Sequence, residues 1–595
     1  MTEKELAKLN GLPTEDPGPR RTAGGLAKYV QGGTVERIIQ KVLPNYALKR
    51  ARARYGLAMG AMVAGYEGAS MSKPSLRNWR PVPYDANSLI QFDQQYLRDR
   101  SRDLERNNAL ALGAINTKCT SVIGTGLTLH AKIDSKFLTM DDDAANEWES
   151  NAEREWKLWY NSIESDAARI LSGPSRQQQV YRRRLVDGDV LSLLKHIRRP
   201  GNPYALKEQI VEGDRLTNPG WAANSQSRAG GIDKDENGAP VTYHIMNRYP
   251  WQVGTNLASL EWIPVPAFGG NTGRRNVLHV FKQERPGQNR GVPDLAPVMH
   301  LLKQLGRFTE AEVDAAVINS YFTVFFTSDM GGEDDFKTVM GGQQKTYSPS
   351  SADDVDLGPG LVHMAPPGTK PEFADPKRPN ANFGAFVEAL FQQIGVALEI
   401  PYEILIKHFT SSYSASQGAL LEAWRFFKSE RKWFIGNYLQ PLYETFLMEA
   451  VSMGRLSAPG FFRDPLVRQA YCGTQWHGDP RGMIDQVKEI SAANLRILMG
   501  MTTLEAETAE ITGGDWEKNI PQIRRERQIL SDLGLMPVMT KMSIAPKPAG
   551  GPQEGVPDPS QPPEDPGGDG SEGSDALLAI GRTTVMSEIK KAIED

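Results

Sequence analysis

The residues that could carry catalysis in this chain lack the spacings that nucleotide, zinc and serine chemistry require. No Gly-x-x-x-x-Gly-Lys-Ser/Thr motif occurs, so the phosphate cradle and the lysine of a P-loop ATPase are absent. The 8 histidines include no His-x-x-x-His pair, which would place two zinc ligands on one helical face. Gly-x-Ser-x-Gly is also absent. The sequence therefore predicts no cofactor, no metal site and no catalytic residue.

One acidic segment resembles the opening of a calcium-binding loop. Its oxygen ligands would begin at Asp233 and Asp235, but the closing position, where such loops have a bidentate Glu, is His244. We therefore expect a β-hairpin turn at Asn237–Gly238 instead. Acid–base catalysis by carboxylates that meet only in the folded chain stays open, because no local pattern reveals such a pair.

Length, charge and cysteine content limit the class of protein. A chain of 595 residues exceeds the size at which one hydrophobic core stops growing, so several modules are expected. The net charge of -4 argues against tight wrapping of DNA, but it suits a channel whose wall must not hold phosphates strongly. Cys119 and Cys472 are the only cysteines, which favours a reducing compartment. No signal peptide and no membrane-spanning run are expected.

The first half of the chain has the pattern of an α+β module at about 115–290. Apolar periodicity predicts a helix over 87–112 and a second helix that turns at Gly124–Gly126 into a strand. The acidic run 141–143 is expected to cap an amphipathic helix. Further strands are predicted at 190–196, 208–211 and 241–245.

The second half is predicted to be mainly helical. A long amphipathic helix starts at Leu295 and leads into a β-rich segment at 321–326. A helix over 383–398 ends before Pro401, because the residue before a proline disfavours helical geometry. The remaining segments are a polar loop at 407–416, an aromatic helix over 420–438 with a kink or boundary at Pro441, and a helical region over 483–533.

The two ends of the chain differ in composition from the middle. Residues 1–85 have a basic bias, glycine pairs and prolines, which is typical of a partly ordered arm. Nucleic-acid contact is one interpretation of this arm, and a solvated charged face is the favoured one. Residues 546–575 are dominated by Pro, Gly, Asp and Glu and predict a disordered tail.

Several short strings occur in an order that resembles the lambda-type family of phage portal proteins. The resemblance covers roughly residues 85–515. Each string is weak evidence alone, whereas their shared order over most of the chain is specific. The landmarks are Arg100–Asn107, Val122–Leu127, Gln209–Asp214, Gly231–Ile232 with Tyr243–His244, Val277–His279, Arg285–Gln288 with Arg290–Gly291, and Tyr413–Ser414.

This resemblance implies a mainly α fold with an α+β wing, a helical stem, a β-rich clip and a helical crown. It also implies assembly as a ring of about twelve subunits. The implied segments are a basic, partly ordered arm (1–85), the wing module (86–293), a stem helix (294–320), the clip (321–379), a second stem helix (380–400), a tunnel loop (401–416), a wing helix and return (417–482), the crown (483–540) and a disordered Pro/Gly/acidic tail (541–595).

The function that the resemblance implies is a head–tail connector at one capsid vertex, which forms the channel for DNA packaging and ejection. The implied partners are the terminase large subunit, which would dock on the clip, the major capsid and scaffold proteins, the head-completion or tail connector proteins, and double-stranded DNA that passes without sequence readout. The implied location is the virion, after assembly in the host cytoplasm. No membrane partner is expected.

Two groups of residues are candidates for contact with DNA in such a channel. Lys407, His408 and Tyr413 lie in a polar, Ser-rich stretch between two strong helices, where we expect a mobile loop.

The second group, Lys303 and Arg307, lies on the polar side of the helix that begins near Leu295 and could contact phosphates. Surface ion pairs with Glu310 and Asp314 explain these two residues equally well.

Two other classes of protein stay open at the level of sequence. The first is a capsid or tail assembly protein that oligomerises without surrounding DNA, and a central pore would distinguish the channel from it. The second is a nuclease or peptidase with a carboxylate cluster formed in space, which metal-dependent turnover would reveal.

Overall fold

The computed structural model describes residues 67–70, 73–252, 259–320, 324–327, 362–365, 383–408, 413–482 and 485–534. Residues 1–66 of the predicted arm, most of the predicted clip at 321–379 and the predicted tail at 541–595 lie outside this part. The chain divides into two compact units, residues 1–519 and 520–595. The division falls inside the segment predicted to be the crown.

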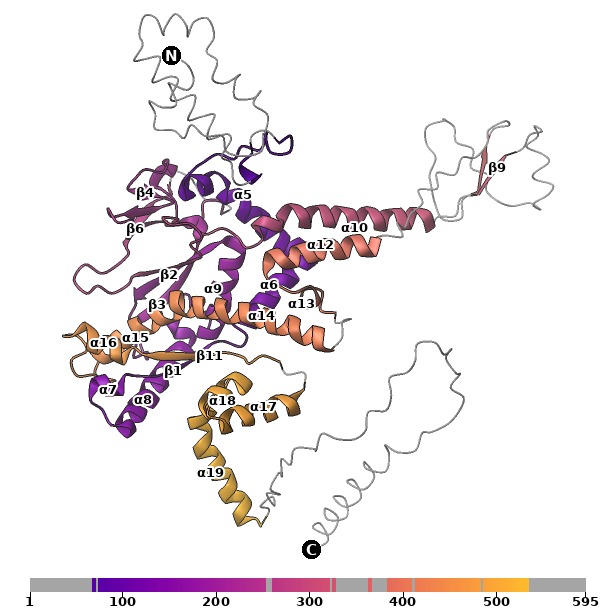
Figure 1. The fold of residues 1–595 in the computed structure, drawn as a ribbon. Coiled ribbons are helices and arrows are strands. Elements are labelled where there is room, and N and C mark those ends of the chain that lie inside the picture. Colours follow the sequence, from indigo (N-terminus) through magenta and orange to yellow (C-terminus); the bar gives the residue numbers. More distant parts are fainter. Residues whose placement is uncertain are drawn as a thin grey trace, which may run out of the picture. The chain divides into compact units, whose positions relative to one another are not determined.

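The first unit is mostly helical in its described residues, and it contains several small sheets (Figure 1). This confirms the prediction of a mainly helical fold that also contains sheets. The longer helices before the predicted clip are α5 (Ala86–Asn107), α6 (Ala109–Val122), α8 (Asp142–Tyr160), α9 (Gly173–Asp187) and α10 (Met299–Ser320), with the short α7 at Ser135–Leu138.

The helices after the predicted clip follow one another closely along the chain. They are α12 (Phe383–Leu398), α13 (Tyr402–Ile406), α14 (Tyr413–Phe434), the π-helix η7 (Ile435–Leu439), α15 (Gln440–Ser452), α16 (Pro465–Tyr471), α17 (Gln486–Leu498), α18 (Leu504–Thr512) and α19 (Trp516–Asp532). Residues 520–534 are the described part of the second unit, and they form most of α19. No helix among the residues searched is long and apolar enough to span a membrane.

The strands form sheets of two, three or four members. One sheet has the order β3-β2-β8 and another has the order β4-β5-β6-β7, with antiparallel neighbours in both. Two pairs are β1 with β11, antiparallel, and β9 with β10, parallel. The bounds are β1 Thr128–Ala131, β2 Asp189–His196, β3 Leu206–Glu212, β4 Arg228–Ala229, β5 Ile232–Lys234, β6 Pro240–Met246, β7 Trp262–Pro266, β8 Val277–Phe281, β9 Val324–Thr327, β10 Val362–Ala365 and β11 Thr474–His477.

The turn between β5 and β6 confirms the hairpin predicted at Asn237–Gly238. Gly238 has a φ of 85°, which favours glycine, and the carboxylate of Asp235 accepts hydrogen bonds from the backbone of Asn237 and Ala239. His244 lies on β6, 2.7 Å from Asp233. No group of His, Cys, Asp and Glu able to hold a metal ion occurs in the part of the chain that the structure describes.

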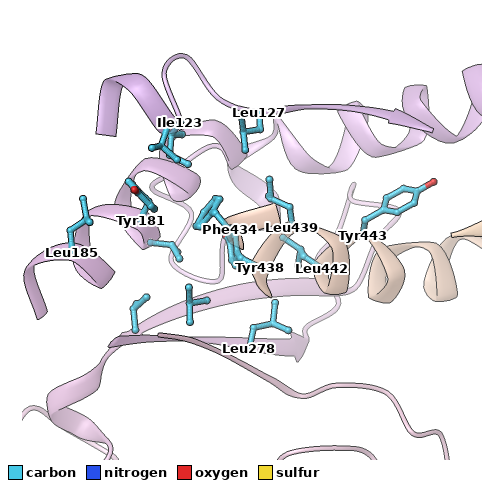
Figure 2. Close-up of a cluster of buried hydrophobic side chains, with 14 of the residues drawn as sticks. Ile123, Leu127, Tyr181, Leu185, Leu278, Phe434, Tyr438, Leu439, Leu442 and Tyr443 are labelled. Carbon is cyan, nitrogen blue, oxygen red and sulfur yellow. The ribbon is translucent and has the colours of Figure 1, made fainter. Parts of the chain in front are cut away.

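The main hydrophobic core lies between α9, the sheet of β8 and the helices on both sides of η7 (Figure 2). Tyr181, Phe434 and Tyr438 are fully buried there, and the ring of Phe434 contacts that of Tyr181 edge to face and that of Tyr438 at a tilt. Because segments almost 260 residues apart along the chain meet here, this core fixes α14 against the α+β module. Burial of each large side chain contributes about 2 kcal/mol of stability.

Helices α10 and α12 lie side by side (Figure 1). The ring of Phe308 on α10 packs against the rings of Phe383 and Phe386 on α12, with centroids 5.5 and 5.3 Å apart. Leu302 and Leu305 are buried on the same side of α10. The two helices are thus joined along an apolar seam, and Lys303 and Arg307 of α10 are exposed.

Three local predictions differ from the structure. The helix predicted over 87–112 is broken at Asn108, whose side chain caps α6 by accepting from the backbone of Ala111. Asp141 precedes α8 without a side-chain capping bond. Asp142 and Asp143 lie in the first turn, where their negative charges interact favourably with the helix dipole. The predicted loop at 401–416 contains α13 and the start of α14, so only 407–412 separates these two helices.

Candidate functional site

The candidate residues on α10 lie on one exposed face. Lys303 and Arg307 are four residues apart, which places them one above the other, and both are exposed. Within the described residues, neither forms an ion pair with Glu310 or Asp314, so the alternative explanation of surface pairing is not observed. Both cations are therefore open to a phosphate backbone.

The candidates after α12 lie at the end of α13. Lys407 ends this helix with a φ of 55°, and the backbone N–H of His408 donates to the carbonyl of Glu403. Both side chains are exposed. Tyr413 is the first residue of α14, and its side chain lies outside the described residues. In the part of the chain that the structure describes, no hydrogen bond or ion pair joins Lys407 or His408 to Lys303 or Arg307.

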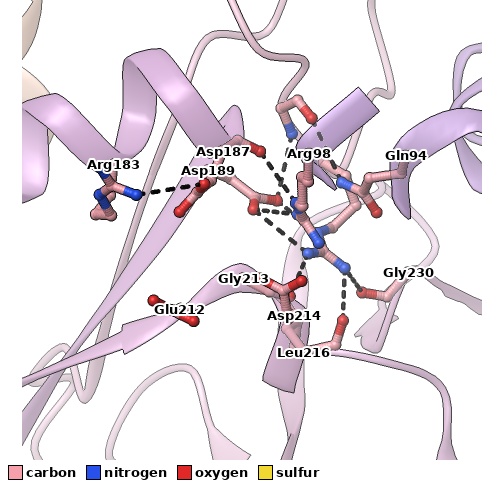
Figure 3. Close-up of polar contacts among 12 residues, drawn as sticks. Gln94, Arg98, Arg183, Asp187, Asp189, Glu212, Gly213, Asp214, Leu216 and Gly230 are labelled. Atoms are coloured by element: carbon pink, nitrogen blue, oxygen red, sulfur yellow. Dashed lines mark hydrogen bonds and ion pairs between the residues drawn. The ribbon is translucent and has the colours of Figure 1, made fainter. Parts of the chain in front are cut away.

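A buried carboxylate, Asp189, organises the α+β module beside these segments (Figure 3). One oxygen accepts from Arg98 of α5, and the other lies 2.6 Å from Nε of Arg290 and 3.4 Å from Nε2 of His279. Burial alone would raise the pKa of Asp189, but Arg290 and Arg98 outweigh it and hold this pKa well below its usual value. Asp189 is therefore ionised and fully paired.

Arg290 extends this network to the backbone of two further segments. Its guanidinium donates to the carbonyls of Gly213 and Leu216, both at 2.6 Å, and to that of Gly230 at 3.0 Å. A Cβ on Gly213 would lie 2.0 Å from the Asp189 carboxylate, so only glycine fits this close approach. The network thereby ties together α5, β2, the turn after β3 and the segment that leads to α10.

A second carboxylate pair continues the network on the side of α5. Arg102 donates to Asp187 at 2.8 Å and to Asp214 at 2.6 Å, and its Nη1 lies 3.2 Å from the hydroxyl of Tyr249. The second oxygen of Asp187 is buried without a hydrogen bond. Burial raises the pKa of Asp187 despite the nearby cation of Arg102.

A third cluster lies at the base of α10. Asp294, five positions before this helix, pairs with Lys118 of α6 at 2.8 Å and with Arg184 of α9 at 3.0 Å. Burial would raise the pKa of Asp294, but Arg184 and Lys118 outweigh it and lower this pKa. Arg184 also lies 3.6 Å from Glu430 of α14. The start of α10 is thus held by charges from two helices of the α+β module.

Sequence reasoning did not identify these buried charges as a group, because their partners lie far apart along the chain. Arg98 and Asp189 are 91 positions apart, and Arg290 is 101 positions from Asp189. A usable signal was present in the family-like strings, since Arg102, Asp214, His279 and Arg290 each fall within one of them. Those strings therefore describe one polar network rather than separate sites.

What these residues can do chemically is to hold elements in place. The buried carboxylates of Asp189 and Asp294 are paired with cations, and the cations on α10 and after α13 are exposed. The arrangement has the character of a scaffold with exposed basic positions.

The sequence of this chain is similar to those of phage portal proteins. Residues 72–431 match the family model described as phage portal protein, lambda family. Portal protein B of Escherichia phage lambda is 23% identical over 495 residues, which cover 80% of this chain and 91% of that protein. The portal protein of Escherichia phage N15 is 22% identical, with 80% and 92% covered. A chain from the virion of a native gene transfer agent particle is 13% identical, with 76% and 96% covered and a TM-score of 0.34.

Proposed function

The chain belongs to the lambda family of phage portal proteins, and from this membership we propose that it forms a closed ring around a channel for DNA. Its role as a head–tail connector in DNA packaging, and its class as a structural protein rather than an enzyme, follow from the family. The proposal concerns how this particular chain builds the channel.

The observation that carries the proposal is the α10–α12 pair. Ring contacts of Phe308 with Phe383 and Phe386 join the two helices. The pair also exposes Lys303 and Arg307, which have no ion-pair partners among the described residues. Val313 on α10 and Val396 on α12 are 61% and 79% exposed, which leaves apolar area for a neighbouring subunit. A head-to-tail interface of this kind closes only as a ring, and we propose about twelve subunits.

In this proposal α10 and α12 are the stem, residues 86–293 with 417–482 are the wing, and 483–540 are the crown. The segment 407–412 between α13 and α14 is the tunnel loop, which is shorter than 401–416 because helices occupy its ends. The clip at 321–379 lies mostly outside the described residues.

The proposed partners follow from the absence of a P-loop motif in the sequence and from the proposed clip. Because the sequence has no P-loop, ATP hydrolysis must come from a separate terminase, for which the clip is the proposed docking surface. A deletion within 330–355 that left terminase binding intact would count against this docking site. Major capsid and scaffold proteins and the head-completion proteins are the other proposed partners, with assembly in the host cytoplasm and final location at a capsid vertex of the virion.

DNA contact is tested by replacing Lys407, His408 and Tyr413 together with Ala in a phage that carries this chain. We expect rings to form and DNA packaging or retention to fall, because the loop would lose its cationic and aromatic contacts with the duplex. Particle DNA content, measured against the same phage with Gln392→Ala on exposed α12 surface, is the readout. Unchanged packaging, retention and ejection would remove these residues from the channel.

A further inference from the structure

One face of α14 is built to bind cations. Phe426, Glu430 and Trp433 are spaced four and three residues apart, so they lie on the same side of the helix. The ammonium groups of Lys118 and Lys282 lie 5.2 and 5.9 Å from the ring centroid of Phe426.

Glu430 is the centre of this face and is almost fully buried. It accepts a hydrogen bond from Lys282 and lies 3.4 Å from the hydroxyl of Tyr181 on α9. The guanidinium of Arg184 lies over Trp433, 5.1 Å from the ring centroid, with Nη1 3.6 Å from Glu430. Three cations from three different elements thus converge on one helix.

Two of these cations also hold the base of α10. Lys118 and Arg184 both pair with Asp294, at 2.8 and 3.0 Å. The backbone N–H of Asp294 donates to the carbonyl of Leu185, which adds a second link between this position and α9. The base of the stem and the cation-binding face of α14 therefore share the same positive charges.

Arg184 occupies an intermediate position between the two carboxylates. Its side chain is 2% exposed, and the same atom, Nη1, faces both Asp294 and Glu430. This nitrogen makes no hydrogen bond of good geometry within the described structure, so charge rather than directed bonding sets its place. If Asp294 or Glu430 is neutralised, the buried charge of Arg184 is balanced by only one carboxylate. The interaction of Arg184 with that remaining carboxylate therefore changes.

We propose that Arg184 is a positioning residue that couples α14 to the base of α10. A displacement of α14 would then pass from Glu430 through Arg184 to Asp294, and thus to the first turns of α10. The naming of α10 as part of the stem rests on the proposed function, whereas the coupling itself rests on the contacts within one chain.

The test uses hydrogen exchange of the purified full-length chain. Asp294→Asn changes a side chain outside α14, but it removes the counter-charge of Lys118 and Arg184, which lie buried against α14. Local opening would let water reach these two cations, so we expect amide exchange over residues 426–434 to become at least about threefold faster. Exchange in β2 should stay unchanged, which separates coupling from global unfolding. Asp314→Asn, on the exposed side of α10, is the matched control and should leave α14 as in the wild type.

Two further variants establish the route. In an Arg184→Met background, Asp294→Asn should add no further acceleration in α14, since the link is already broken. If Asp294→Asn fails to fold, the reciprocal variant Glu430→Gln should speed exchange in the first turns of α10, because coupling between two sites is reciprocal. Unchanged exchange at the distant element in these variants, or an equal effect of Asp294→Asn with and without Arg184, would overturn the proposal.

Electron microscopy of the same samples separates this inference from the proposed function. If the wild type formed no ring and Asp294→Asn still loosened α14, the channel assignment would fail while the coupling held. If rings formed and α14 did not respond, the coupling alone would fail.

Discussion

At the scale of single residues, several buried charges join segments that are distant in sequence. Asp189 joins α5, β2, β8 and the segment before α10 through Arg98, His279 and Arg290. Taking these charges out of water costs several kcal/mol per ion, and the pairing offsets that cost only while every partner is present. The network therefore specifies one arrangement of the elements.

Asp189→Asn should destabilise the folded chain by about 3–5 kcal/mol, because two buried guanidinium groups lose their counter-charge. Urea unfolding followed by circular dichroism measures this change. Asp93→Asn, on the exposed side of α5, is the control and should shift the free energy of unfolding by no more than about 0.5 kcal/mol. Similar unfolding midpoints for both variants would contradict the role given to Asp189.

His130 predicts how stability changes with pH. Its ring packs 4.1 Å from that of His477, and Nδ1 lies 3.0 Å from Asp515 and 3.3 Å from Lys518, which itself binds Glu153. Burial, His477 and Lys518 lower the pKa of His130 from 6.5 to about 4, against the opposing effect of Asp515. Between these values the unfolded chain binds a proton that the folded chain does not, so stability falls as the pH drops.

His130→Asn should therefore lose less thermal stability than the wild type between pH 7 and pH 5. The melting temperature at the two pH values is the measurement. His196→Asn, at an exposed position at the end of β2, should keep the pH dependence of the wild type. An unaltered pH dependence in His130→Asn would show that this imidazole does not contribute.

At the scale of elements, the sequence was most informative where one local signal was strong. The helix at 383–398 has the predicted bounds because its apolar periodicity is regular and Pro401 ends it. The break at Asn108 was missed because the apolar pattern continues across it, and only the capping bond to Ala111 shows that a new helix starts.

The kink or boundary predicted at Pro441 is confirmed, because the π-helix η7 ends at Leu439 and Pro441 lies in the first turn of α15. Proline has no N–H to donate, which would normally interrupt a helix. Here the N–H of Gln440 donates to the carbonyl of Ile435, five residues earlier, which is the hydrogen-bond spacing of a π-helix. The chain then continues as α15. Burial of Tyr438 and Leu439 in the core favours the π-helix, and no local sequence pattern could indicate it.

Lys303→Ala with Arg307→Ala tests the exposed face of α10. Binding of double-stranded DNA should show a shallower dependence on salt, since fewer counterions are released when fewer phosphates are contacted. The free energy of unfolding should change by no more than about 0.5 kcal/mol, because both side chains are exposed. The paired control is Glu310→Gln with Asp314→Asn, which should not flatten the salt dependence. An equally steep dependence in the Lys303/Arg307 variant would exclude these two residues from DNA contact.

At the scale of the whole molecule, single-chain packing leaves apolar surface uncovered. Val396 on α12 is 79% exposed, and Val487 and Leu498 on α17 are each 76% exposed. The net charge of -4 on 595 residues gives only weak repulsion between copies. Such surface fits an assembly of copies, whose geometry no local sequence pattern could supply.

Val396→Asp should prevent ring closure without unfolding the chain, because a carboxylate at this position would be desolvated against a neighbouring subunit. Sedimentation velocity measures the loss of the large species, and circular dichroism checks that the fold is kept. Gln392→Asp, which adds the same charge one turn earlier at an exposed polar position, should assemble more readily. Normal assembly of Val396→Asp would exclude this part of α12 from the interface.

The central claim is that copies of this chain surround a DNA channel, and electron microscopy of the purified protein with two-dimensional averaging tests it most directly. We expect rings of about twelve subunits with a central pore wide enough for double-stranded DNA. A closed particle without a pore would contradict the claim.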